Sequence, residues 1–286
     1  MGAGKGHTIQ WLFQNDLFPF DAFVNVDPDA IRALLPEVPQ YNAVDDQRTG
    51  HLTQKEVGYI SEVLSYDALT KGRNVLVDGS LRNAHWYMEY FRNLRAEFPI
   101  VKIAILQVAA PVETVLRRAA KRALVTGRVV PEDVILDSIR SIPESFRLLS
   151  PSAEFVATFI NEDDPPEPEP HVSSCTLQKD DCLGVLWHMQ EYRVSEEEEG
   201  GEGGAQGGRY RYELKRFQDG VELEEQLDSW KDVFRNVWEM RCAMPSKDFA
   251  VAEAPLAQAQ VAVALDGLDQ SEPSVSGKKR KSITSS

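Results

Sequence analysis

The stretch Met1-Gly2-Ala3-Gly4-Lys5-Gly6-His7-Thr8 decides the fold, because it has the pattern of a phosphate-binding loop that runs into a helix. Glycines let successive backbone N–H groups approach phosphate oxygens, a lysine adds positive charge, and the helix adds its positive N-terminal end. The complete pattern G-x-x-x-x-G-K-[ST] would begin upstream of Met1, and Gly6 stands where that pattern has a hydroxyl residue. Thr8 is the nearest hydroxyl that could help to hold Mg²⁺. The alternative interpretation is an arbitrary glycine-rich segment.

Composition and charge narrow the class of protein. The chain of 286 residues has 42% hydrophobic residues, no apolar run of about 18 residues that could span a membrane, and no N-terminal secretory signal. A cytoplasmic protein is therefore expected. The net charge of −14 argues against general affinity for nucleic acid or for an anionic membrane. Cys175, Cys182 and Cys242 are too few for a disulfide framework and lack a zinc-binding C-x-x-C pair.

Strands and helices alternate through the first half of the chain. Apolar runs at 23–26, 74–77, 100–108 and 154–160 predict strands. Helical spacing predicts helices at 7–15 and 86–98, after Thr53 in a capping-box pattern, and from Pro28, Pro111 and Pro131. Such alternation indicates an α/β fold with a mostly parallel sheet.

Acidic residues follow two of the predicted strands, at the edge where open parallel sheets bind ligands. Asp27 and Asp29 follow the first run, and Asp78 follows the second, with Ser80 close behind. Each has a simpler alternative, since Asp27 before Pro28 also fits a helix N-cap and Asp78 could cap a turn.

Three arginines form a second candidate cluster. Arg118 and Arg122 are four residues apart and therefore share one helix face, and Arg128 follows in the next loop. Phosphoryl transfer needs a cradle for the donor phosphates, a carboxylate for the attacking hydroxyl and cations for the transferring group. The alternative for the arginines is a solvated helix face.

In this order, the motifs resemble the zeta toxin family of P-loop kinases. The resemblance covers about residues 1–161, in the segments 2–5, 26–32, 74–83, 111–113, 118–122, 127–131 and 142–145. It implies a three-layer α/β/α kinase that uses ATP and Mg²⁺ to phosphorylate a hydroxyl of a small molecule, such as a nucleotide sugar. Bacterial toxins of this family phosphorylate UDP-N-acetylglucosamine.

The resemblance also implies roles for individual residues. Asp29 matches the catalytic base, and Asp78 stands where the bacterial toxins tend to have glutamate, which leaves the acceptor open. The remaining matches are Gly2, Gly4, Lys5, Gly6 and Thr8 for the nucleotide, Thr8 also for Mg²⁺, Ser80 and Arg82 beside Asp78 for the acceptor, and Arg118, Arg122 and Arg128 for catalysis.

The competing hypothesis is a noncatalytic nucleotide-binding or interaction protein that keeps the kinase fold with an incomplete loop. In P-loop kinases of this type, the strand before the loop lies in the middle of the sheet. We therefore expect either that Met1 is an internal methionine of a longer protein or that the sheet lacks its first strand. Upstream sequence with a strand and the first loop glycine would favour the kinase.

The composition changes after the kinase-like region. Residues 162–208 are predicted to be an acidic linker, rich in Pro, Glu and Gly, with a short ordered segment near 180–194. Residues 209–244 are predicted to form a small appended element, whose helix, with Trp230 and Trp238, is more often a packing helix than a recognition helix for an unknown protein partner. Residues 245–286 are predicted to be a disordered, dispensable tail. Its basic cluster at 278–281 is compatible with nuclear import, although most such clusters are solvated tails.

Overall fold

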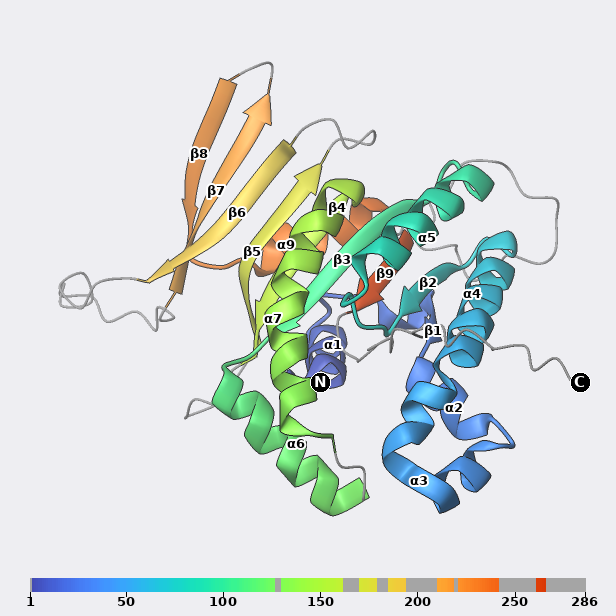
Figure 1. Ribbon diagram of the computed structural model, residues 1–286. Helices are drawn as coiled ribbons and strands as arrows, with labels where there is room; N and C mark the ends of the chain where they lie inside the picture. Colours follow the sequence, from blue (N-terminus) through green and yellow to red (C-terminus); the bar gives the residue numbers. More distant parts are fainter. Residues whose placement is uncertain are drawn as a thin grey trace, which may run out of the picture.

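The computed structural model describes residues 2–126, 130–161, 170–178, 185–193, 210–218, 221–241 and 261–265, shown in Figure 1. Within these ranges the chain forms a nine-stranded sheet in the order β1-β2-β9-β3-β4-β5-β6-β7-β8. The side chains in these ranges are described as well, except those of residues 45–48, 51, 126, 240–241 and 261–265. The strands from β1 to β4 in this order pair in parallel, and those from β4 to β8 pair antiparallel.

The parallel half has the α/β architecture that the sequence predicts, and that prediction of the fold class is confirmed. Its strands are β1 (Phe23–Val26), β2 (Asn74–Val77), β3 (Lys102–Ala109), β4 (Phe155–Ile160) and β9 (Val261–Leu265). The helices of this half are α1 (Lys5–Gln14), which precedes β1, and α2 (Pro28–Leu34), α3 (Val38–Leu52), α4 (Gln54–Thr70), α5 (Ala84–Glu97), α6 (Val112–Thr126) and α7 (Glu132–Leu149). Short 3₁₀ turns lie at Phe20–Ala22 and Ser150–Ser152.

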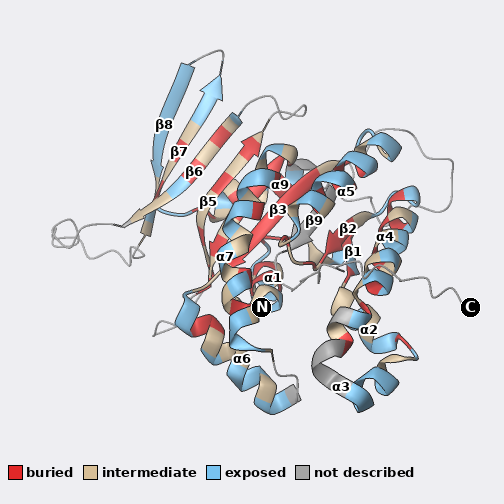
Figure 2. Cartoon of the chain, in the orientation of Figure 1, coloured by how far each residue is buried: buried red, intermediate tan, exposed pale blue. Residues whose placement is uncertain are grey.

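Successive strand residues point to opposite faces of the sheet, which produces two apolar cores and hence three layers. On one face, Leu76, Leu106 and Phe155 pack with residues of α1 and α9 (Lys231–Arg241). On the other face, Val75 and Ile105 pack with residues of α4, α5 and α7. Strands β3 and β4 are buried along most of their length, which Figure 2 shows for β3, as expected for strands covered on both sides.

The second half of the chain continues the same sheet. Strands β5 (His171–Gln178), β6 (Val185–Arg193), β7 (Tyr210–Gln218) and β8 (Val221–Leu227) extend it from β4. The sequence predicts order only near 180–194 within the linker, so β5 is a strand that it misses. Alternation in residues 171–178 is weak because the strand has polar residues on both faces, which hides the period of two.

Helix α9 packs against the sheet, which confirms its interpretation as a packing helix. Trp230, Phe234 and Trp238 are all buried, and the Phe234 ring contacts the rings of Phe155 and Phe159 on β4. Aromatic pairs of this kind are worth about 0.5–1.5 kcal/mol each beyond the burial of area. The appended element therefore shares a core with the α/β domain.

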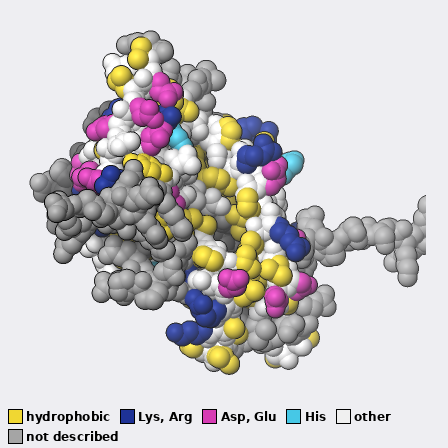
Figure 3. All heavy atoms as spheres, turned by 90° about the vertical axis from the view of Figure 1, so that its left-hand side faces the viewer, with side chains coloured by type: hydrophobic (Ala, Val, Ile, Leu, Met, Phe, Trp, Pro, Cys, Tyr) yellow, Lys and Arg dark blue, Asp and Glu magenta, His cyan; other side chains and the backbone are white. Residues whose placement is uncertain are grey.

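The far edge of the sheet is polar. In Figure 3, which faces the antiparallel strands, acidic side chains gather on the upper part of the molecule. Along β8 the side chains of Glu222, Glu224 and Glu225 are exposed, and Lys215 of β7 pairs with the first two. Charge on an edge strand hinders pairing with other chains. No described helix is long and apolar enough to cross a membrane.

Strand β9 corrects two expectations from the sequence. It lies between β2 and β3, pairing in parallel with residues 75–77 and 102–106, at the centre where a missing strand is predicted. It also belongs to the tail that is predicted to be disordered, whose other residues lie outside the described ranges. The run Val261-Ala262-Val263-Ala264-Leu265 is short and uniformly apolar, as strands buried on both faces are. It also satisfies backbone groups that β2 and β3 would otherwise leave unpaired.

Candidate active site

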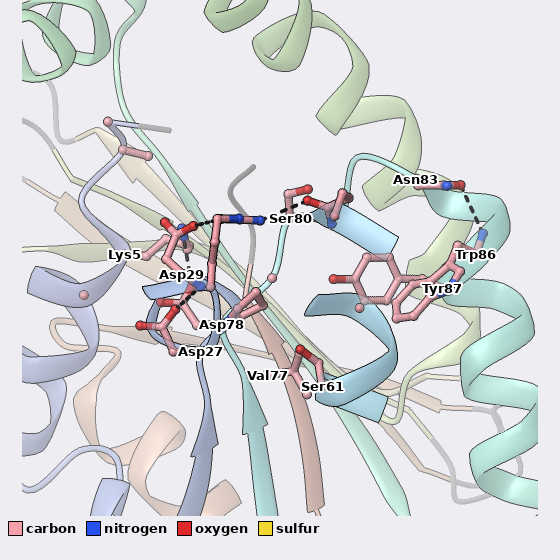
Figure 4. A pocket seen from close by; sticks show the side chains of 18 of the residues that line it. Lys5, Asp27, Asp29, Ser61, Val77, Asp78, Ser80, Asn83, Trp86 and Tyr87 are labelled. Atoms are coloured by element: carbon pink, nitrogen blue, oxygen red, sulfur yellow. Dashed lines mark hydrogen bonds and ion pairs between the residues drawn. The ribbon is translucent and has the colours of Figure 1, made fainter. Parts of the chain in front are cut away.

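A pocket of about 700 Å³ lies at the carboxyl ends of β1 and β2, beside the start of α1. Figure 4 shows Lys5, Asp27, Asp29 and Asp78 gathered on one side of it, with Trp86 and Tyr87 on the other. Its lining includes the predicted residues Gly2, Gly4, Lys5, Gly6, Asp29, Asp78, Ser80, Arg118 and Arg122. The structure therefore brings most of the predicted site residues to one cavity.

The glycine loop enters α1 through a left-handed residue. Gly4 has φ 86° and ψ 32° and precedes the first turn of the helix, a conformation that favours glycine. The backbone N–H groups at the start of a helix have no partners within the helix, and the helix dipole adds partial positive charge there. The loop thus has the architecture of an anion site. Lys5 adds a cation, and its Nζ lies 3.4 Å from Asp78 Oδ1.

Thr8 does not face this pocket, which corrects its predicted roles toward nucleotide and Mg²⁺. Its side chain is fully buried, and its hydroxyl donates to the Gly4 carbonyl at 3.3 Å. One helical turn separates Thr8 from Gly4, so the threonine hydroxyl is engaged by the Gly4 carbonyl at the start of α1 and does not reach the pocket. At the position directly after Lys5, where the motif has its hydroxyl, the chain has Gly6.

Asp27 and Asp29 divide two tasks at the end of β1. Asp27 caps α2, because its Oδ1 accepts from the backbone N–H of Asp29 at 2.8 Å and of Ala30 at 3.3 Å. The Asp29 carboxylate is held by Arg32, with 2.5 Å between Oδ1 and Nη1. Asp29 is therefore the oriented carboxylate of the pair, and Asp27 fixes the helix that carries it.

Arg32 links this carboxylate to α4. Its Nε donates to Thr53 Oγ1 at 3.0 Å and its Nη2 donates to Gln54 Oε1 at 3.2 Å. The sequence predicts that Thr53 caps α4, but the structure has no such side-chain cap, since the Thr53 hydroxyl donates to the Thr49 carbonyl. Arg32 and Gln54 both line the pocket. The Arg32 guanidinium thus links α2 to the start of α4 at the pocket.

The carboxylate of Asp78 occupies an electrostatically unfavourable position in the site. Burial raises the pKa of its carboxyl above the ordinary value, Lys5 partly offsets this, and Asp27 and Asp29 raise it further. The ionised form therefore carries a cost in this structure. A cation or a hydrogen-bond donor brought by a ligand would lower that cost.

The opposite wall of the pocket is aromatic. Tyr87 brings its hydroxyl so close to Gly79 that a Cβ there would lie 2.3 Å from the oxygen, so only glycine permits the approach. Trp86 stacks on Tyr90 at 5.0 Å between ring centroids. Glu62 also lines the pocket, and burial raises the pKa of its carboxyl while a hydrogen bond from Trp86 partly offsets the shift. Ser80 lies between the two walls in Figure 4.

The structure places the predicted arginines in different surroundings. Arg118 and Arg122 line the pocket, and Arg118 also donates to the loop carbonyl of Ala3 at 3.1 Å. Arg82 does not line it, which corrects its predicted role at the acceptor. Its guanidinium pairs with Asp137 and donates to Ser138 Oγ, both on α7, because the turn after Ser80 directs the side chain to that helix. Arg128 lies outside the described residues.

The residues that sequence reasoning misses include Asn161, which lies behind the loop, and Tyr87, on the aromatic wall. Asn161 follows the last residue of β4, and its position after a parallel strand is a signal that the sequence does contain. Its buried side chain donates to the carbonyl of Ala3. Tyr87 has no such signal, because its helical spacing is that of an ordinary core residue.

A magnesium ion fits this site only in company with a ligand. No group of three or more described His, Cys, Asp or Glu side chains converges to hold a metal. In kinases, however, Mg²⁺ is usually held by one or two carboxylates together with substrate phosphates and water. Asp78 and Asp29, which both line the pocket, supply oxygen ligands of that kind.

One comparison with known proteins identifies a family. The family model described as zeta toxin matches residues 1–166, more than half of the chain. No curated protein and no solved structure matches this chain. The matched region contains the pocket, all of its predicted site residues and β1 to β4.

Proposed function

This chain belongs to the zeta toxin family, whose P-loop kinase-like domain indicates nucleotide binding and phosphoryl transfer, and on that basis we propose that it phosphorylates a hydroxyl group of a small molecule with ATP. The observation that carries the proposal is the gathering of the glycine loop, Lys5, Asp29 and Asp78 around one pocket. Phosphoryl transfer requires this inventory of groups.

The donor side of the pocket is the loop with the start of α1. Backbone N–H groups there would bind the β- and γ-phosphates, and Lys5 would exchange its pairing with Asp78 for the phosphate oxygens. Arg122, and Arg118 where its loop contacts allow, would spread the charge of the transferring group. Mg²⁺, when bound with the nucleotide, would neutralise charge on the phosphates.

The acceptor side is the aromatic wall with Asp29 opposite. The acceptor oxygen would attack the γ-phosphorus, its proton would pass to the Asp29 carboxylate, and the bond to the β-bridging oxygen would break to release ADP. Arg32 keeps that carboxylate in place during the step. Trp86 and Tyr87 offer a surface for an apolar or planar part of the acceptor, a class that includes nucleotide sugars.

Purified protein incubated with Mg²⁺ and ATP, in the presence of pools of nucleotide sugars and other hydroxyl metabolites, tests the proposal. We expect ADP release that depends on one pool, with a product that carries one added phosphoryl group in mass spectrometry. Lys5→Met should abolish it. Tight ATP binding without any acceptor-dependent product would instead favour the noncatalytic nucleotide-binding protein.

A further inference from the structure

Three consecutive loop carbonyls are bound from one side by two side chains. Asn161 Nδ2 donates to the Ala3 carbonyl at 2.8 Å and to that of Gly4 at 3.5 Å. Arg118 Nη1 donates to the carbonyls of Gly2 at 3.4 Å and Ala3 at 3.1 Å. Its Nη2 donates to Asn161 Oδ1 at 3.4 Å, which joins the two side chains into one unit.

Asn161 is fixed from the sheet. Its side chain and backbone are only 1% exposed, and its N–H donates to the Ala109 carbonyl at 2.8 Å, at the shared end of β3 and β4. Its approach to the loop requires glycine, because a Cβ on Gly4 would lie 2.2 Å from Nδ2. The contact is therefore a close and specific one between the sheet and the loop.

The geometry of the peptide group gives this contact a direction. In a trans peptide the carbonyl of one residue and the N–H of the next point to opposite sides. The Ala3 carbonyl faces Asn161, so the N–H of Gly4 faces away from it. The Gly4 carbonyl accepts mainly from the backbone N–H of Thr8, at 2.9 Å, so α1 itself orients the N–H of Lys5. Gly4 and Lys5 both line the pocket.

We propose that Asn161 is a positioning residue for the phosphate site, which aims the N–H of Gly4 at the donor phosphates by holding the Ala3 carbonyl behind it. This inference rests on the proposed function, since it concerns the nucleotide that the kinase would bind. Donors that are already oriented lose little freedom when phosphate arrives, and the affinity gains accordingly. The side chain acts through the loop and does not itself contact the ligand.

Isothermal titration calorimetry on the full chain tests the proposal, with Mg²⁺·ATP and Mg²⁺·tripolyphosphate as probes. Asn161→Ala should weaken the binding of both by about tenfold, the value of one or two lost hydrogen bonds. The equal loss is the signature of a phosphate effect, because tripolyphosphate has no base or sugar. Thr158→Val is the matched control. Thr158 lies on β4, three residues before Asn161, and the substitution removes its hydrogen bond to Gln107 without touching the loop. It should leave both affinities unchanged.

Each result decides between the two proposals. Wild-type protein that binds neither probe overturns the phosphate site and with it both claims. Wild type and Asn161→Ala with equal dissociation constants overturn the positioning role alone, and so does a loss confined to ATP. Partial misfolding is recognised because it lowers the binding stoichiometry and leaves the dissociation constant unchanged. If Asn161→Ala does not fold, Asn161→Ser, which keeps a short polar group, is judged by the same criteria.

Discussion

At the residue scale, the two aspartates at the end of β1 show how identical side chains only two residues apart acquire different roles. Both line the pocket, but Asp27 is engaged by backbone N–H groups, whereas Asp29 pairs with Arg32. We expect Asp29→Asn to lower acceptor-dependent turnover by about 10²–10⁴ with an unchanged melting temperature, because general-base assistance has that value.

Asp27→Asn should leave most of the turnover, since asparagine also caps helices well, and Asp27→Ala should lose about 1 kcal/mol of stability with the cap. Turnover and thermal melting of the three variants, measured side by side, check this division. Wild-type turnover in Asp29→Asn together with an inactive Asp27→Asn would mean that the two roles are exchanged.

Asp78 leads to a prediction of how the stability of the folded protein depends on pH. Burial raises the pKa of its carboxyl, so above that pKa the ionised side chain destabilises the folded protein. This cost disappears as the pH falls, because the carboxyl is then protonated in both the folded and the unfolded protein. Asp78→Asn should therefore melt above the wild type at neutral pH, with a gain that shrinks as the pH is lowered toward about 4.

Melting curves from pH 8 downward, without nucleotide, measure this gain. Asp67→Asn is the control, since Asp67 is exposed in an i,i+4 pair with Lys71 and should show no gain at neutral pH. A melting temperature of Asp78→Asn that lies below the wild type at neutral pH would mean that the Lys5 pairing outweighs the cost of burial.

At the scale of the elements, Arg32 joins α2 to α4 through Thr53 and Gln54. Arg32→Gln should cost about 1–3 kcal/mol of stability, because it leaves partly buried acceptors without their donor. For a domain of this size, that equals a fall of roughly 2–12 °C in melting temperature. The exposed Arg92, paired with Glu89 on α5, provides the control, and Arg92→Gln should change melting by no more than a degree or two. Equal effects of the two substitutions would show that the link contributes nothing.

Local sequence patterns predict elements better than they predict side-chain partners. Asp27 followed by Pro28 defines the start of α2, because a cap involves only neighbouring residues. Thr53 matches a capping box, yet its hydroxyl bonds to Thr49 and Arg32, since a long-range donor competes for the same oxygen. Arg82 likewise turns to Asp137, more than fifty residues away. A single sequence gives no signal for such distant pairings.

At the scale of the whole molecule, the alternation of strands and helices predicts the parallel sheet and the edge where the pocket lies. It does not predict which segment fills the central position, because a strand's neighbours depend on tertiary pairing and not on its own sequence. Residues 261–265 form a short run, and the alanine-rich stretch at 249–260 that precedes them leaves no clear boundary to mark it as a strand. Their place between β2 and β3 is decided by the backbone groups that those strands offer.

That position gives the last prediction. A chain that ends at residue 245 lacks β9 and exposes the facing edges of β2 and β3, whereas a chain that ends at residue 266 keeps the strand. A domain is stable by only about 5–15 kcal/mol, and a central strand contributes on both edges. We expect the shorter chain to melt at least 10 °C below the full chain, or to lose cooperative melting. The conversion is about 2–4 °C of melting temperature for each kcal/mol of unfolding free energy lost. The longer truncation should melt like the full chain in circular dichroism. Equal melting of both truncations would show that the sheet does not need residues 261–265 at its centre.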